Sequence, residues 1–217
     1  PVTAPLPLPV VFSQIRGAFT ALDRKLWLLL LHLEWDNLMS KSKVGEWHEI
    51  TESELIRIFS KYSGAKDIEN IWNSIRRLTR THVEYQFIEE DERWEASSTL
   101  FIGAYKPKQK RDGIIRFMFP PNLVPVILEP GRFARLRVGF LLKLDSKYAV
   151  TLYQMLETVA NMREPTLEAT VEELRAWLKI PDGKLTEWGN IWKFALQPAL
   201  SEVNKNPDLS GMCVTHE

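Results

Sequence analysis

Apolar residues recur at intervals of three and four along several stretches of the chain, the spacing of one face of an α-helix. The pattern is clearest in residues 144–159, where Tyr148, Leu152, Met155, Leu156 and Val159 share a face. Similar stretches cover residues 22–35, 51–59 and 170–178 and surround the tripeptide Asn-Ile-Trp at 70–72 and again at 190–192. The pattern therefore predicts six helices.

These helical stretches form two sets that follow the same order. The first set consists of LDRKLWLLLLHLEW, TESELIRIF and the first Asn-Ile-Trp helix. The second set consists of LDSKYAVTLYQMLETV, TVEELRAWL and the second Asn-Ile-Trp helix, each about 120 residues further along. Three matches at nearly one offset indicate a unit that is built twice.

Polar residues mark where these helices begin and end. Asp23 and Asp145 stand where they can accept amide protons at a helix start. Thr51 to Glu54 and Thr170 to Glu173 fit the capping box, in which a Thr hydroxyl and a Glu carboxylate satisfy each other's backbone amides. Breaks at 62–64 and 181–183 then separate the second helix of each set from the third, which predicts two helix-turn-helix units.

The spacing becomes strand-like after the first set. Residues 83–90, 93–105 and 113–119 are rich in β-branched and aromatic residues. A helix, a helix-turn-helix and a hairpin follow one another in a winged helix, so we predict an α+β fold with tandem winged-helix domains. The second copy reaches only GMCVTHE, and its wing is expected to be truncated. The predicted parts are a Pro-rich extended arm at 1–20, a first winged helix at 21–129 and a second at 130–217.

Composition narrows the class of protein. The chain has 217 residues, 45% of them hydrophobic, and no apolar run long enough to cross a bilayer. The single Cys213 fits a reducing cytosol, so a cytoplasmic protein is expected. Lys plus Arg and Asp plus Glu both number 28, and the resulting zero net charge counts against nucleic-acid binding unless the basic residues cluster.

Catalytic motifs are not found in the sequence. Phosphate-binding glycine loops and the GxSxG nucleophile motif do not occur, and no two histidines have the i, i+4 spacing of a helical metal site. We therefore expect a protein that is not an enzyme and that uses no cofactor and no metal.

From about Thr20 onward the sequence resembles the iteron-binding Rep family of plasmid replication initiators. The resemblance rests on LDSKYAVTLYQML, then VEELRAWLKIP, then LQPALSEVN, and on FPPNLVPVIL followed by RFARLRV where the two domains join. It implies two winged-helix domains that bind direct repeats in origin DNA and repress the protein's own promoter. It also implies a homodimer through the first domain, a DNA-binding monomer, and contacts with a host initiator ATPase and the replicative helicase.

Candidate DNA-binding residues lie on helix faces left over once the apolar residues are assigned to the core. Arginine suits guanine edges and phosphates, and asparagine suits adenine. In the first copy these candidates are Asn70, Asn73, Ser74, Arg76, Arg77 and Arg80. The alternative interpretation of each is a solvated helix face.

The segment KPKQKRDG between two predicted strands is the second candidate. It carries Lys106, Lys108, Lys110 and Arg111, which suit phosphate contacts at the tip of a wing, or serve only solubility.

The second Asn-Ile-Trp helix is the third candidate, although it carries less positive charge. Trp188, Ile191, Ala195 and Ala199 are assigned to its core face, and Pro198 is expected to kink it. The candidate readers are Lys184, Thr186, Asn190, Lys193 and Gln197. Two other functions fit the same pattern: a double winged-helix transcription regulator, and a winged-helix module that binds protein.

Overall fold

The computed structural model describes residues 3–7, 14–40, 43–62, 67–108, 113–128 and 133–216. The first copy of the repeat forms a winged helix that contains the three predicted helices in order, together with a short helix and a strand that were not predicted. Its elements are α2 (Ala21–Leu33), α3 (Trp35–Met39), β3 (His48–Thr51), α4 (Glu52–Tyr62), α5 (Ile68–Leu78), β6 (Gly103–Tyr105) and β7 (Ile114–Met118). Strand β7 pairs antiparallel with both β3 and β6, so KPKQKRDG joins the two strands of a hairpin. This hairpin is the wing.

A second hairpin is inserted between α5 and the wing. It consists of β4 (His82–Glu89) and β5 (Glu92–Thr99), and β2 (Gln14–Arg16) pairs with the outer edge of β4. The strand expected over residues 93–105 is therefore two strands in different sheets. After β5 the chain leaves the sheet of β2, β4 and β5 at Leu100 and Phe101, whose side chains are buried in the core. The alternation of apolar and polar residues along a strand does not reveal which sheet the strand joins.

The second copy repeats the helices. It contains α8 (Lys147–Val159), α9 (Val171–Trp177), α10 (Trp188–Ile191), η1 (Trp192–Leu196), α11 (Gln197–Asn204) and α12 (Pro207–Ser210). Helix α8 packs on α11 as α2 packs on α5. Asn70 and Asn190 lie in corresponding third helices, as the repeat predicts. Residues 211–216, the described part of the expected truncated wing, form no strand.

Pro198 changes the hydrogen bonding of the third helix of the second copy. Residues 192–196 form a π-helical turn directly before it, between α10 and α11. A proline ring clashes with the carbonyl group four residues earlier and has no N–H to donate to it, and a wider turn relieves that conflict. The predicted kink is thus a π-turn within one helical segment from 188 to 204, which we call the second reading helix.

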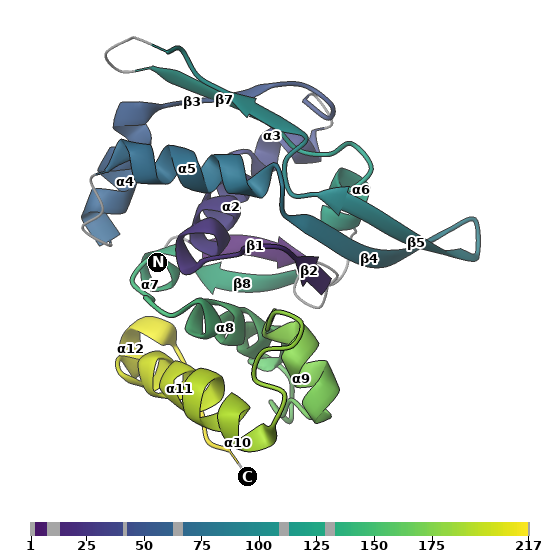
Figure 1. Ribbon diagram of the computed structural model, residues 1–217, viewed down its shortest axis with the longest axis vertical. Helices are drawn as coiled ribbons and strands as arrows, with labels where there is room; N and C mark the ends of the chain where they lie inside the picture. The colour runs from purple at the N-terminus through teal and green to yellow at the C-terminus, as the bar shows by residue number, and fades with distance from the viewer. Residues whose placement is uncertain are drawn as a thin grey trace.

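The N-terminal arm and the chain between the copies form a two-stranded sheet. Strand β1 (Thr3–Pro7) pairs antiparallel with β8 (Phe133–Arg137), and the short helices α6 (Val124–Ile127) and α7 (Val138–Leu141) flank β8 in the chain. Figure 1 shows this sheet between the winged helix and helices α8 to α12. Residues 3–7 and 14–16 of the arm are extended, as expected, and they pair with strands of the body.

Helix caps follow the predictions in part. Thr170 and Glu173 form a complete capping box, and the Thr51 hydroxyl accepts from the Glu54 amide. Asp23 accepts from the backbone of Thr20, which is itself the cap of α2. The prediction for Asp145 was wrong because Ser146 caps α8.

Two buried cations of α2 join the copies. The Arg24 side chain is 2% exposed, and its Nη1 donates to the carbonyl groups of Lys147, at 2.7 Å, and Leu178, at 3.3 Å, and to the Thr151 hydroxyl. Burial lowers the pKa of Arg24 to about 9, so the guanidinium still carries its charge at neutral pH. Lys25 donates to two carbonyl groups after α7, at 2.7 and 3.1 Å. These bonds fix the first domain against the second.

Candidate nucleic-acid interface

Helix α5 presents a polar face opposite its core residues. Ile71, Ile75 and Leu78 are fully buried, as predicted, because they point at α2. Asn70, Arg76 and Arg80 are exposed. Asn73 is partly buried, and its Oδ1 accepts from Arg76 Nη1 at 3.4 Å. We call these four residues the α5 face, although Arg80 lies two residues beyond the end of α5, and they combine two cations with two amides. The exposed Glu69 lies on the same side of the helix, with its carboxylate 3.6 Å from Lys106 Nζ.

Ser74 and Arg77 do not belong to that face. Ser74 is fully buried, and its hydroxyl donates to Asp23 Oδ1 at 2.5 Å, so the expectation that it lies on a solvent-facing side was wrong. Arg77 Nη2 donates to the same oxygen at 2.8 Å, and its Nε lies 3.1 Å from both carboxylate oxygens. Because Asp23 is fully buried, the guanidinium of Arg77 serves to neutralise a buried charge.

Lys106 holds the base of the wing. Its Nζ lies 3.2 Å from a carboxylate oxygen of Glu52, 3.6 Å from one of Glu69 and 5.5 Å from the centre of the Trp72 ring. Lys108 is exposed, whereas Lys110 and Arg111 lie outside the described residues. Two carboxylates therefore already compensate the charge of Lys106, and its contact with a phosphate stays a prediction.

Glu52 positions the other side of the wing, a role that the sequence did not indicate. Its carboxylate accepts from the Gly113 amide at 3.2 Å, and its own amide donates to the Gly113 carbonyl at 3.0 Å. Glu52 is the first residue of α4 and also binds Lys106. The strands of the wing thus leave the body at a fixed point beside α4 and α5.

All five predicted readers on and before the second reading helix are exposed. Lys184, Thr186, Asn190, Lys193 and Gln197 have solvent-exposed side chains. Ile191, Ala195 and Ala199 are fully buried, as predicted, and fix the rotation of the helix. The helix therefore turns a face containing one lysine and two amides to solvent.

Trp188 was wrongly assigned to the core. Its side chain is 49% exposed, and its ring lies 6.1 Å from that of Trp192, which in turn contacts the His216 ring at 4.4 Å. Trp188 lies in the first turn of the helix, four residues before Trp192. Its side chain therefore packs against Trp192 and does not reach the core. An indole with one face in solvent suits an interface.

Arg175 fixes the turn that leads into this helix. Its Nη1 donates to the Lys184 carbonyl at 2.6 Å and also to the Leu185 carbonyl. Lys179, Gly183 and Leu185 have backbone φ angles of 56°, 73° and 45°, in the left-handed region, so the turn is tight. The sequence suggested Gly183 as a break but contained no signal for Arg175.

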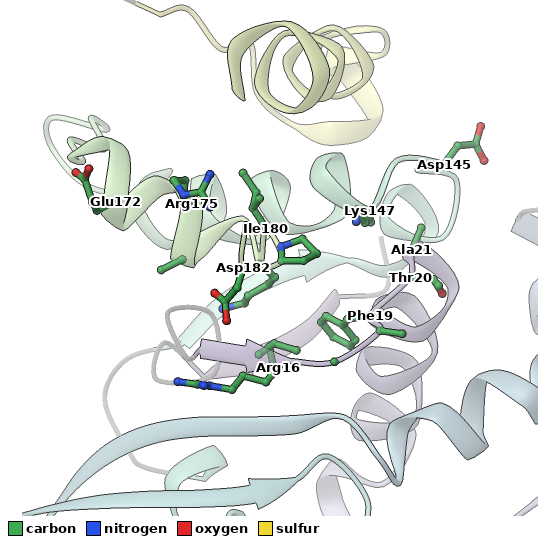
Figure 2. Close-up of a pocket in the computed structure, with 16 residues that line it drawn as sticks. Arg16, Phe19, Thr20, Ala21, Asp145, Lys147, Glu172, Arg175, Ile180 and Asp182 are labelled. Carbon is green, nitrogen blue, oxygen red and sulfur yellow. The ribbon is translucent and has the colours of Figure 1, made fainter. Parts of the chain in front are cut away.

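A cavity of about 850 Å³ lies between the two copies (Figure 2). Figure 2 shows Arg16 on one wall and Glu172, Arg175 and Asp182 on the other. Cations and carboxylates alternate around it, so its charge favours neither an anion nor a cation. Among the described residues no cluster of His, Cys, Asp and Glu could hold a metal ion, and no described helix is long and apolar enough to cross a membrane.

Two family models together match most of the chain, and the first match extends into α8. Residues 10–157 match the family described as initiator replication protein, WH1, and residues 170–215 match initiator Rep protein, WH2. The chain belongs to the initiator Rep protein family. Its two winged-helix domains and the α+β class are thereby confirmed. Membership also supports a role in replication initiation that involves DNA binding.

Solved structures and curated proteins add little to the family assignment. One similar structure is the crystal structure of the WH1 domain of MSBI1.176, a replication protein isolated from a multiple sclerosis patient. It is 12% identical, with a TM-score of 0.37, over 58% of this chain and 87% of that one. Curated proteins give no match. The assignment therefore rests on the two family models.

Proposed function

We propose that the chain is a plasmid replication initiator that recognises direct repeats, or iterons, in origin DNA through both winged helices and also represses its own promoter. The observation that carries the proposal is the pair of exposed polar faces on corresponding third helices. One is the α5 face, and the other is formed by Lys184, Thr186, Asn190, Lys193 and Gln197 on and before the second reading helix.

The two faces suit different parts of recognition. Arg76 and Arg80 on the α5 face bring two full charges, which suit phosphates or guanine edges. The second reading helix has only Lys193 as a cation among its exposed residues from 188 to 201, beside amides that suit base edges. We therefore assign most of the phosphate affinity to the first domain and much of the base readout to the second.

Partners follow from the family resemblance and form part of the same proposal. The protein acts without catalysis or a cofactor, pairs as a homodimer through the first domain, and binds an iteron as a monomer. The bound monomer then contacts the host initiator ATPase and the replicative helicase in the bacterial cytoplasm. The exposed outer strand β5 of the inserted hairpin offers an edge for such pairing.

A mobility-shift titration tests the proposal. The probes are duplexes that carry the direct repeats found beside the gene for this chain, and scrambled duplexes of the same composition. We expect binding to the repeats to be at least about 1,000-fold tighter than to the scrambled control, and to weaken steeply as salt rises. Equal binding to both duplexes would refute sequence-specific recognition. Binding to neither would favour the alternative of a protein-binding module, which the zero net charge of the chain also fits.

A further inference from the structure

Gly189 occupies a helical position where the fold itself leaves room for a side chain. A Cβ built on Gly189 would meet no atom within 4 Å. Its φ angle is not positive, whereas Gly183 and Gly211 have φ angles of 73° and 80°, which favour glycine. Neither crowding nor backbone conformation within the protein therefore explains a glycine at position 189.

Glycine is also unfavourable for the helix that contains it. It loses more conformational freedom on folding than any other residue, and alanine is the best helix former. Gly189 is the second residue of a helical segment that continues to residue 204, so a side chain there would stabilise the segment, although by less than in the helix interior. A glycine with this cost is typical of a place where another molecule comes close to the backbone.

The surroundings of Gly189 indicate what that molecule is. Lys193 and Gln197 follow it at intervals of four, so they share its side of the helix, and both are exposed. Asn190 is exposed beside it, and Glu187 is the acidic neighbour, just before the helix. The exposed rings of Trp188 and Phe194 are also close by, so the surface is not purely polar. The lysine and two amides nearest the open stretch of backbone suit the acceptor-rich edge of a DNA groove.

We propose that Gly189 marks the closest approach of duplex DNA to the second domain. The inference rests on the proposed function and makes it more specific: the helix lies so deep in the groove that a single methyl group at position 189 would collide with the DNA. Gly189 is thus a specificity-determining position even though it has no side chain.

Gly189→Ala and Gly189→Leu test the proposal, because both residues are good helix formers. We expect the Tm of Gly189→Ala to be unchanged or raised by about 1–4 °C. Its affinity for the repeat duplex should nevertheless fall by about tenfold, since a methyl group would overfill a packed interface, and Gly189→Leu should bind more weakly still. Asn161→Ala is the control, with the same new side chain at an exposed position outside the second reading helix, and it should bind as the wild type does.

The outcomes separate this proposal from the function on which it rests. If the wild type discriminates the repeats and Gly189→Ala binds them equally well, the close approach is refuted and the proposed function stands. A fall in Tm together with a fall in affinity would show that the fold itself needs the glycine, which also overturns the proposal. If the wild type fails to bind either duplex, the proposed function fails first.

Discussion

Replacing Asp23 by alanine is expected to lower the free energy of unfolding by about 3–5 kcal/mol. The carboxylate is fully buried and accepts hydrogen bonds from Ser74, Arg77 and the Thr20 amide. Its removal would leave the Ser74 hydroxyl buried without this acceptor and Arg77 without its counter-charge. Urea unfolding followed by circular dichroism measures the change.

Asp145→Ala is the matched control, because the repeat places Asp145 where the second copy corresponds to Asp23. Asp145 is exposed and does not cap its helix. The same substitution there should change stability by no more than about 0.5 kcal/mol. Equal losses at both positions would mean that the two aspartates share a general role at a helix start, contrary to the network described for Asp23.

The double substitution Arg76→Gln and Arg80→Gln should weaken binding to all duplexes by a factor on the order of 10–100 at physiological salt. Both side chains are exposed, so the fold should keep its stability. The slope of log affinity against log salt should flatten by up to about 0.9 for each phosphate that the variant no longer neutralises. Affinities measured by fluorescence anisotropy at several salt concentrations give both quantities.

Arg93→Gln combined with Arg163→Gln removes the same charge from exposed positions outside the α5 face. This control should leave the slope almost unchanged, because the Debye length at physiological salt is only about 8 Å. If the control flattens the slope as much as the test variant does, binding responds to net charge alone, and the α5 face has no special part in it. Arg77 is left intact in both variants, because its loss would also weaken the core through Asp23.

The helical part of the fold could be predicted because local signals specify it. Apolar spacing identified the buried row of α5 and, apart from Trp188, that of the second reading helix, and the repeat identified corresponding helices. The sequence did not distinguish the inserted hairpin from the wing, because the pairing of β7 with β3 joins residues that are far apart in the chain. Strand propensity and the alternation of apolar and polar residues indicate where a strand is and which face is buried. They do not indicate with which other strand it pairs.

The structure bears on the exposure of the candidate residues, and their contacts with DNA stay a prediction. Asn70, Arg76 and Arg80 are exposed as expected, whereas Ser74 points at a buried carboxylate from another helix. Residue type suggested a DNA contact for Lys106, but Glu52 compensates its charge. A solvated cation and one paired across a tertiary contact look the same in a sequence, because the partner lies elsewhere in the chain.

The central claim is that exposed side chains of the winged helices read bases, and a substitution profile tests it most directly. Wild type and Asn190→Ala are titrated against the repeat duplex and every singly substituted version of it. Asn161→Ala serves as the control, since Asn161 is exposed but lies outside both reading helices.

We predict that the wild type loses affinity by about 1–3 kcal/mol at each base pair it contacts. Asn190→Ala should lose this preference at one or two adjacent positions, with its salt slope nearly intact. A profile for Asn190→Ala that matches the wild type at every position would contradict base reading by the second domain.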